Sequence, residues 1–292
     1  MLMQTVTEQA YAKINVFLEI AGTDERGYHL LDSVMQSVSL CDTVTLARAK
    51  EPGVHLTCSD PAVPIGEKNI ATRAANLFLQ EAGMSDLGVE IHIDKRIPME
   101  AGLAGGSTDA AAVLRGLNRL FETGWTAGRL CELGLCLGAD VPFCVRGGAM
   151  RARGVGEQLV PVPALPDCFL VLAKPGEGVS TKDAYTRYDA LANPPRPGIE
   201  RMLRGLADGD LHGIAAALFN SLEEVAGLSS VARIEQAMRD QGACGALMTG
   251  SGSCVFGIFE REQRARQCAQ ALVKAYPFAC VAQPAPAYDL EK

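Results

Sequence analysis

The chain has 292 residues, 48% of them hydrophobic and 21% charged, so it can bury the core of one large or two medium-sized domains. Its formal net charge is −7 and it has no long basic run, which argues against nucleic acid or an anionic membrane as the main partner. Ten scattered cysteines without a CxxC pair or a secretory leader, and the lack of an apolar run of roughly 20 residues, indicate a globular cytoplasmic protein with reduced thiols.

The first predicted element is a strand that follows a loose polar lead over residues 1–9. Apolar residues alternate over residues 10–20, which places Lys13 and Asn15 on the same side of the strand. A lysine on a half-buried strand reaches solvent or pairs with a carboxylate, and both interpretations stay open here. A turn at residues 24–29 comes next, where Tyr28 could stack on a ligand or pack against its own hairpin.

Further strands and one helix lead up to a glycine-rich stretch. Strands are expected at residues 33–39, 42–47, 53–58 and 89–93, and a helix at residues 69–82 that ends at Gly83. Lys95 and Arg96 follow the last of these strands. They could neutralise phosphate charge or simply solvate the strand end.

Residues 98–112 combine a glycine-rich turn with the start of a helix that extends to about residue 121. Gly102, Gly105 and Gly106 allow close approach of a ligand to the backbone, and Ser107, Thr108 and Asp109 are expected to cap the helix. Free N–H groups and the helix dipole at this end favour a bound phosphate. An ordinary loop before a capped helix is the alternative, since the stretch matches neither a Walker A loop nor a dinucleotide fingerprint.

A single carboxylate stands out after the next predicted helix, which covers residues 127–137. Asp140 lies in an apolar segment, where a carboxylate is costly unless it is paired or used. It is either the partner of Lys13 or a turn residue that caps backbone donors before Pro142. Glycines at residues 147–156 then mark a strand pair, and the prolines after it place a domain boundary near residue 160, which gives domains of residues 1–160 and 161–292.

The second part of the chain is predicted to be α+β. A strand at residues 168–173 precedes a helix that starts near Ser180 and carries Tyr185, which faces either a cleft or the core. Helices at residues 198–206, 211–226, 230–241 and 262–275 surround a strand, a Gly-Ser turn and a strand at residues 246–259, and residues 280–283 form a last strand. The turn with Gly250 and Ser251 could face the same phosphate as the first glycine loop or be an ordinary hairpin turn. The four histidines lack the spacing of zinc ligands, so no zinc site is predicted.

Three of these stretches together resemble the motifs of the GHMP kinases, in the same order and with similar spacing. They are Ala-Tyr-Ala-Lys-Ile-Asn at residues 10–15, the glycine-rich loop with its helix start at residues 98–111, and Met-Thr-Gly-Ser-Gly-Ser-Cys at residues 248–254. The resemblance implies a two-domain α+β fold, with an N-terminal ribosomal-protein-S5-like domain, a ferredoxin-like C-terminal domain and the active site in the cleft between them. It also implies a kinase that uses ATP with Mg²⁺.

The resemblance also assigns roles to single residues. Lys13 and Asp140 match the catalytic pair, Asn69 and Lys95 fall where the family contacts the nucleotide, and Ser107 is a candidate Mg²⁺ ligand. The segment that holds the ATP phosphates comprises Pro98, Met99, Glu100, Ala101, Gly102, Leu103, Ala104, Gly105, Gly106, Ser107 and Thr108, with Ala104 where many members have glycine and Thr108 where many have serine.

On the acceptor side, residues 26–29 and 137–143 resemble the members that phosphorylate a methylerythritol linked to cytidine diphosphate, in the non-mevalonate isoprenoid pathway. The residues implied to bind this substrate are Asn15, Tyr28, His29, Tyr185, Gly250 and Ser251. A kinase of a smaller alcohol, such as homoserine or mevalonate, and a non-catalytic nucleotide sensor are the alternatives. Whether the protein is a monomer or a homodimer stays open.

Overall fold

The computed structural model describes residues 5–290, so the first four residues of the predicted polar lead lie outside it. The first part of the chain contains β1 (Thr5–Thr23), β2 (His29–Ala49), β3 (Gly53–Cys58), the 3-10 helix η1 (Gly66–Lys68), α1 (Ile70–Glu81), β4 (Gly88–Asp94), α2 (Gly105–Leu120), α3 (Ala127–Leu137), α4 (Val141–Arg146), β5 (Ala149–Gly154) and β6 (Gln158–Pro161). The second part contains β7 (Phe169–Lys174), α5 (Thr181–Asp189), α6 (Glu200–Asp208), α7 (Leu211–Ala216), β8 (Phe219–Asn220), α8 (Glu223–Ala226), α9 (Ser229–Asp240), β9 (Gly245–Met248), β10 (Val255–Phe259), α10 (Glu262–Leu272) and β11 (Phe278–Ala282). Across residues 5–290, no helix has the length and apolar character needed to cross a membrane.

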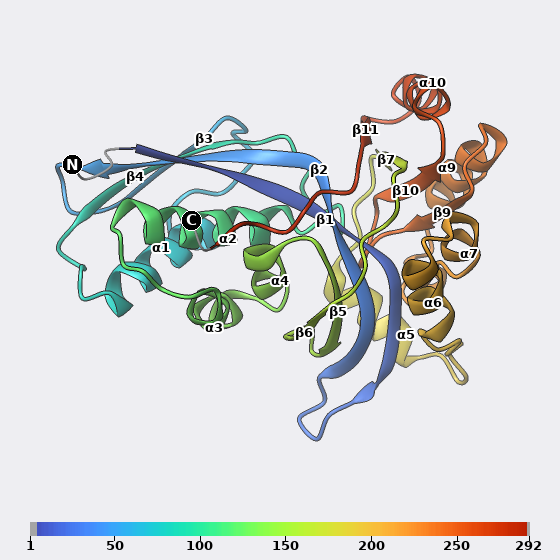
Figure 1. Cartoon of the computed structure of the whole chain (residues 1–292), viewed down its shortest axis with the longest axis horizontal. Helices are drawn as coiled ribbons and strands as arrows, with labels where there is room; N and C mark the ends of the chain where they lie inside the picture. Colours follow the sequence, from blue (N-terminus) through green and yellow to red (C-terminus); the bar gives the residue numbers. More distant parts are fainter. Residues whose placement is uncertain (1–4, 291–292) are drawn as a thin grey trace.

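A seven-stranded sheet organises the first part. Its strand order is β3-β4-β2-β1-β8, and β5 pairs with β2 and with β6. Helices α1, α2 and α3 lie along one face of this sheet (Figure 1). Helix α2 packs closely because its inward positions are small or aliphatic: a Cβ added at Gly116 would lie 2.4 Å from the Leu46 side chain. This close packing fixes the start of α2 relative to β1 and β2.

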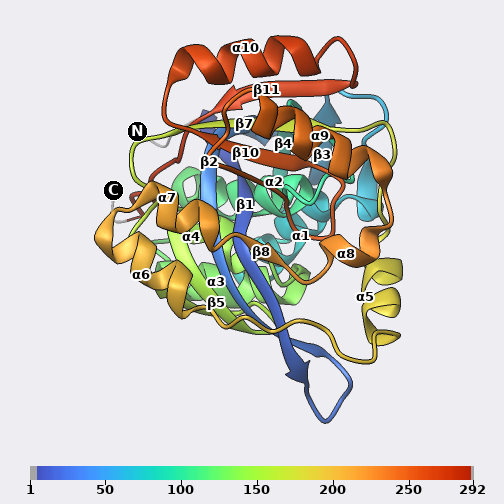
Figure 2. The same cartoon turned by 90° about the vertical axis from the view of Figure 1, so that its right-hand side faces the viewer.

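The second sheet has the strand order β11-β7-β10-β9 and is antiparallel. Its elements follow the β-α-β-β-α-β order β7-α9-β9-β10-α10-β11, which is the ferredoxin-like arrangement expected from the sequence. Helices α9 and α10 cover its outer face (Figure 2). On the inner face, Leu172 and Phe256 share a core with Ile14 of β1 and Met202 of α6. One hydrophobic core therefore joins the two sheets.

Two segments from the second part of the chain lie against the first sheet. Strand β8 pairs in parallel with β1, Phe219 opposite Phe17. The C-terminal tail runs from β11 back toward α2 (Figure 1), where the Tyr288 hydroxyl donates to the Gln9 carbonyl oxygen at 2.9 Å and Arg115 lies 3.5 Å over the Tyr288 ring. These contacts hold the two parts of the molecule together from both sides.

The structure departs from the predicted elements at several places. Residues 5–9, expected in a loose polar lead, already belong to β1, where they pair with β2. Residues 33–39 and 42–47 belong to one continuous strand, β2, because its pairing with β1 continues through register shifts where a break was expected. The helix predicted at residues 211–226 is instead α7, β8 and α8. There Ser221 N–H donates to the Leu18 carbonyl oxygen at 2.9 Å and the Asn220 amide donates to two carbonyl oxygens near β9, so tertiary hydrogen bonds replace those of a helix.

Candidate active site

A cleft of about 690 Å³ lies between the two sheets. It is lined by most of the residues singled out in the sequence: Lys13, Asn15, Asn69, Lys95, residues 98–107, Asp140, Tyr185, Gly250 and Ser251. Thr108, Tyr28 and His29 lie outside this lining. The Thr108 side chain is buried, and its hydroxyl donates to the Gly105 carbonyl oxygen at 2.9 Å.

The two glycine loops are in direct contact with each other. Gly102 has φ +71°, and a Cβ added there would lie 2.1 Å from the Thr249 carbonyl oxygen. Cys254 N–H donates to the Ala101 carbonyl oxygen at 3.2 Å, which fixes the second loop against the first. Only glycine allows this approach at residue 102, and as a result both loops open into the same cleft.

The start of α2 corrects one expectation. The helix begins at Gly105, and its N-cap is Ala104 at φ +59°. The methyl side chain of Ala104 has no atom that can accept a capping hydrogen bond. Ser107, Thr108 and Asp109 therefore lie inside the helix and are not N-caps as predicted. The first N–H groups of a helix have no partners within it, and here Gly105, Gly106 and Ser107 line a cleft, which is the arrangement that binds anions.

Lys13 and Asp140 come together from β1 and from the residue before α4. Lys13 Nζ lies 3.8 Å from Asp140 Oδ2 and donates to Asn15 Oδ1 at 2.6 Å. The Lys13 side chain is 5% exposed and that of Asp140 35% exposed. Asp140 occupies the N-cap position of α4, but its side chain accepts no capping hydrogen bond within residues 5–290, so the pairing alternative is the one observed.

Asn15 is held by residues that the sequence did not single out. Its backbone N–H donates to the Thr249 hydroxyl at 2.9 Å, and its amide donates to the Ser33 hydroxyl at 2.9 Å. The Ser33 hydroxyl in turn donates to the Phe17 carbonyl oxygen at 2.7 Å. This chain of hydrogen bonds orients the Asn15 side chain, which then positions Lys13. The contact between a β1 amide and the second glycine loop has no local sequence signal.

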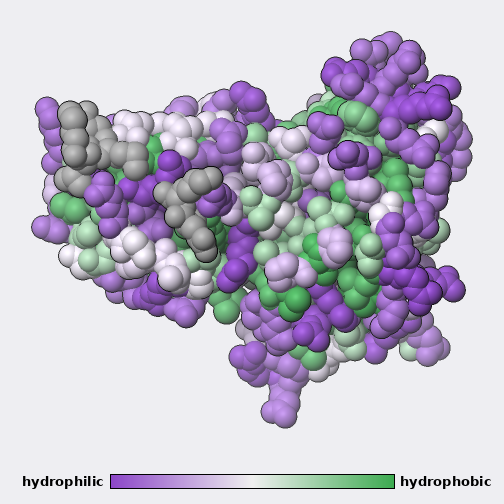
Figure 3. Space-filling model, in the orientation of Figure 1, coloured by the Kyte–Doolittle hydropathy of each residue, from purple (hydrophilic) through white to green (hydrophobic). Residues whose placement is uncertain are grey.

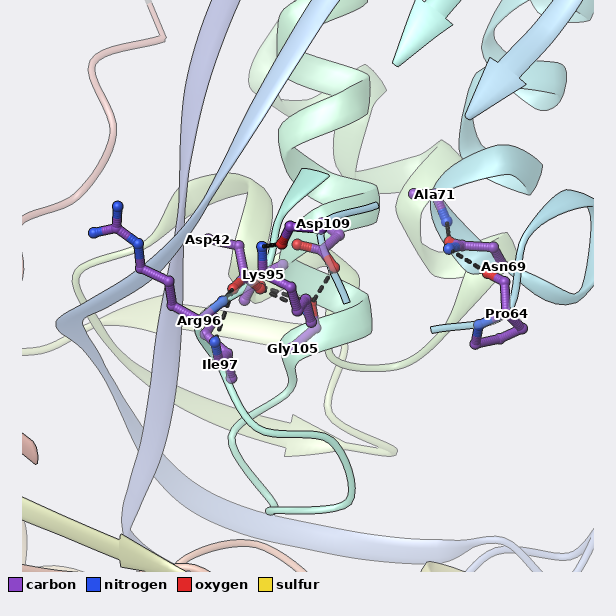
Figure 4. Close-up of polar contacts among 11 residues, drawn as sticks. Asp42, Pro64, Asn69, Ala71, Lys95, Arg96, Ile97, Gly105 and Asp109 are labelled. Carbon is purple, nitrogen blue, oxygen red and sulfur yellow. Dashed lines mark hydrogen bonds and ion pairs between the residues drawn. The ribbon is translucent and has the colours of Figure 1, made fainter. Parts of the chain in front are cut away.

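Lys95 lies beneath the first glycine loop in a closed triad with Asp42 and Asp109 (Figure 4). Its Nζ donates at 2.6 Å to each carboxylate, and all three side chains are at most 5% exposed. Asp42 Oδ1 also accepts the N–H groups of Arg96 and Ile97 at 2.6 and 2.8 Å. Asp109 Oδ1 is buried without a hydrogen-bond partner among the described residues.

Charge and burial oppose each other in this triad. Burial raises the pKa of Asp109 to about 8 although Lys95 pulls it down. Burial disfavours the charged form of Lys95, but Asp109 and Asp42 outweigh it and raise its pKa. The lysine therefore stays charged, with its hydrogen bonds directed at the two carboxylates, and a Cβ added at Gly105 would lie 3.1 Å from its Nζ. The charge of Lys95, directly under the start of α2, is thus shared with two acidic side chains.

Asn69 has a structural task at the far end of the cleft. Its Oδ1 accepts the Ala71 N–H at 2.8 Å as the N-cap of α1, and its Nδ2 donates to the Pro64 carbonyl oxygen at 2.8 Å (Figure 4). The side chain is 6% exposed. These bonds hold the segment before α1 against the cleft.

The aromatic residues on the opposite side are arranged in two sets. Tyr185 and His29 pack with ring centroids 4.6 Å apart, and His29 Nε2 lies 2.7 Å from Asp189 Oδ1. Burial, and next the charge of Asp140, raise the pKa of Tyr185 to about 12, so the phenol keeps its proton. Tyr28 is 59% exposed at the tip of the β1–β2 hairpin. This hairpin projects at the bottom of Figure 1, and its surface is hydrophilic in Figure 3.

Two segments of the chain match models of known protein families. Residues 69–148 match the model of the GHMP kinases N terminal domain, and residues 202–277 match that of the GHMP kinases C terminal domain. The chain belongs to the GHMP kinase family. It is an ATP-dependent kinase, and its two-domain α+β architecture is the one that the sequence motifs predicted.

Relatives narrow the position of this GHMP kinase within the family. The chain is 40% identical over 276 residues to 4-diphosphocytidyl-2-C-methyl-D-erythritol kinase of Alkaliphilus metalliredigens, covering 94% of each chain. A crystal structure of 4-(cytidine 5'-diphospho)-2C-methyl-D-erythritol kinase superimposes with a TM-score of 0.81 at 37% identity, covering 95% of this chain and 98% of that one. Homoserine kinase of Cytophaga hutchinsonii shares the fold, with a TM-score of 0.76 at 20% identity, 98% of this chain and 96% of that one being covered.

The cleft of this GHMP kinase suits a nucleotide triphosphate. The glycine loop and the uncapped start of α2 offer backbone donors to a bound anion. Several lining residues were not predicted, among them Val63, Lys68, Val179 and Thr181. Val63 and Val179 come from loops, Lys68 from the end of η1 and Thr181 from the start of α5, and none of them belongs to a motif. The Thr181 hydroxyl lies 2.9 Å from the hydroxyl of Ser251, a predicted position.

Proposed function

We propose that this kinase transfers the γ-phosphoryl group of ATP to the 2-hydroxyl of 4-diphosphocytidyl-2-C-methyl-D-erythritol. The observation that carries the proposal is the 40% identity to a kinase of that name over 94% of both chains. The cleft supports it, because the Lys13–Asp140 pair opens into the same space as the glycine loop. This places an acceptor hydroxyl and the donor phosphates within reach of each other.

In the proposed reaction Asp140 accepts the proton of the acceptor hydroxyl or holds that hydroxyl in line with the γ-phosphorus. Its partly exposed carboxylate is free to do so, while Lys13 offsets negative charge near the acceptor. The glycine loop and the N–H groups of α2 hold the phosphates. Most of the rate enhancement then comes from alignment and charge stabilisation.

Mg²⁺ is the proposed metal, and it neutralises charge on the transferring phosphates when it is bound. The donors at this end of the cleft fit a cation that prefers oxygen: the Ser107 hydroxyl lines the cleft, and Asp109 has a buried oxygen that lacks a partner among residues 5–290. Ser107 is the candidate ligand. Mg²⁺ keeps several waters and binds phosphates in such sites, so few protein ligands are needed.

The cytosine is proposed to stack on Tyr185, with His29 beside it and Tyr28 reaching in from the hairpin tip. The packed Tyr185 and His29 rings at the edge of the cleft support this placement. Gly250 and Ser251 then lie next to the acceptor, beside Asn15. A small acceptor such as homoserine would need none of these aromatic rings.

One assay separates the proposed function from its alternatives. ADP release is measured with ATP and a panel of acceptors that includes 4-diphosphocytidyl-2-C-methyl-D-erythritol, homoserine and mevalonate. We expect turnover with the cytidine compound alone. Turnover with a smaller alcohol would replace the proposed substrate, and nucleotide binding without turnover on any acceptor would indicate a sensor.

The proposed function also implies that the enzyme is cytoplasmic. ATP and a cytidine-linked substrate are cytoplasmic metabolites, and all ten cysteines are free thiols, which suits a reducing compartment. The protein is proposed to act as a monomer or a homodimer.

A further inference from the structure

Three side chains that coordinate transition metals meet at one end of the four-stranded sheet, outside the kinase cleft. They are His212 on α7, Cys244 before β9 and Glu260 after β10. One ligand atom from each, a ring nitrogen, the Sγ and a carboxylate oxygen, lies within 4.8 Å of the other two. His212 Nε2 is 3.3 Å from Glu260 Oε1. The three residues are far apart in sequence, so spacing could not predict the cluster.

The backbone fixes where these side chains start. Cys244 N–H donates to the Ile258 carbonyl oxygen at 2.8 Å, which holds Cys244 beside the end of β10, and Glu260 follows that strand directly. Helix α7 presses on the start of β9: a Cβ added at Gly245 would lie 2.9 Å from Leu218 and 3.1 Å from Ala215. Figure 1 shows α7 and β9 side by side. His212, in the first turn of α7, is therefore carried to Cys244.

The types of ligand atom in this cluster indicate which metal ion it would bind. A thiolate, an imidazole and a carboxylate are the ligands of zinc in three-residue sites, where water takes the fourth position of the tetrahedron. Mg²⁺ and Ca²⁺ prefer oxygen ligands throughout and would leave the thiol unused. The His212 and Glu260 side chains are 71% and 56% exposed, so they can turn toward an ion and leave its fourth position open to water.

We propose that His212, Cys244 and Glu260 bind one Zn²⁺ ion on the surface of the C-terminal domain. Binding replaces the Cys244 thiol proton with a Zn–S bond and releases that proton to solvent, so no oxidant or reductant is involved. All three residues lie outside the lining of the kinase cleft, and the site is therefore distinct from the Mg²⁺–ATP site.

The test titrates the full-length, metal-free protein with Zn²⁺ against a chromophoric chelator, and then with Co²⁺ as a spectroscopic probe. We expect one Zn²⁺ per chain and a thiolate-to-cobalt charge-transfer band. Cys244→Ser should abolish the band. His212→Gln and Glu260→Gln should each weaken Zn²⁺ binding at least about tenfold.

Matched controls are available elsewhere on the protein surface. Cys136 is another exposed free thiol and His55 another exposed imidazole, so Cys136→Ser and His55→Ala should leave Zn²⁺ affinity and the cobalt band unchanged. Unchanged kinase turnover in every variant verifies the fold. Less than one Zn²⁺ per chain, a cobalt complex without the thiolate band, or equal affinity in Cys244→Ser and Cys136→Ser would show that His212 and Glu260 form only a surface ion pair and would overturn the proposal.

Discussion

Two lysines reach the active-site cleft, Lys13 from β1 and Lys95 from the segment that follows β4, and their carboxylate partners differ in distance and in exposure. Lys95 donates at 2.6 Å to both Asp42 and Asp109 in a group that is almost sealed from solvent. Lys13 lies 3.8 Å from Asp140, whose side chain is 35% exposed. The first group is closed to solvent, and among the described residues Asp109 Oδ1 is its one buried oxygen without a hydrogen-bond partner. The second has a carboxylate with free lone pairs that face the cleft.

The difference shows how the same chemistry serves architecture in one place and reaction in the other. A buried charge whose partners are complete holds elements together, and removing one partner leaves an uncompensated charge. A charge whose partner is partly exposed can bind and orient a substrate group at little structural cost. We therefore expect the Lys95 group to govern stability and the Lys13 group to govern turnover.

The largest effect is expected from Asp140→Asn, which keeps the shape of the side chain and removes its basic oxygen. We expect kcat to fall roughly 10²- to 10⁴-fold, the usual contribution of a general base, with little change in thermal stability or in KM for ATP. ADP release in a coupled assay measures this. Asp86→Asn, at an exposed position, is the control. Near-normal turnover in Asp140→Asn would place Asp140 outside the chemistry.

Lys95→Met should be the most destabilising of the lysine variants. It leaves the buried Asp42 carboxylate without its cation and Asp109 without a hydrogen-bond donor, which typically costs about 3 to 5 kcal/mol. Lys13→Met should lower the free energy of unfolding clearly less, because Asp140 keeps access to water. Its effect on kcat should be larger relative to its loss of stability than that of Lys95→Met. Urea unfolding of both variants gives the comparison. Equal losses of stability would contradict the division between the two groups.

Asp109→Asn tests the electrostatics of the closed group through pH. The folded state keeps the Asp109 proton up to a pKa of about 8, while the unfolded state releases it near 3.8, so this residue lowers stability as pH rises through that window. The amide that replaces this carboxyl group cannot titrate and can still accept from Lys95. The variant should therefore gain stability relative to the wild type from the acidic to the basic end of the window. A constant difference in urea midpoints would show that Asp109 is ionised throughout.

The smallest effect is expected from Ala104→Gly, in the loop that passes over both lysines. Leu103 accepts the Lys13 N–H at 3.2 Å, and Gly105 lies above Lys95. Glycine relieves the left-handed conformation of Ala104 but adds freedom to the unfolded chain, so the net gain should stay below about 1 kcal/mol. A differential scanning measurement detects it, and kcat should be unchanged. A clear loss of stability would show that the Ala104 methyl group contributes packing.

Much of the fold could be predicted because its signals are local. The strand at Gly53–Cys58 and the helix at Ala127–Leu137 were predicted with the observed bounds. Their signals are the periodicity of the element and the glycine at one of its ends, and both are local in sequence. The helix predicted at residues 211–226 is wrong because Ser221 bonds to β1, far away in sequence. The cap of α2 was misplaced because Ala104 adopts a backbone conformation that is typical of glycine.

The sequence by itself determined the glycine loops, the apolar setting of Asp140 and the family, because each is a short pattern with its own chemistry. Only the tertiary structure decided that the two loops touch at Gly102, that Thr249 holds Asn15, and that Lys95 is closed by Asp42 and Asp109. Such pairs depend on how the strands and helices pack, and packing is set by the whole core. Which lysine has buried carboxylate partners and which has a partly exposed one is therefore a property of the folded chain.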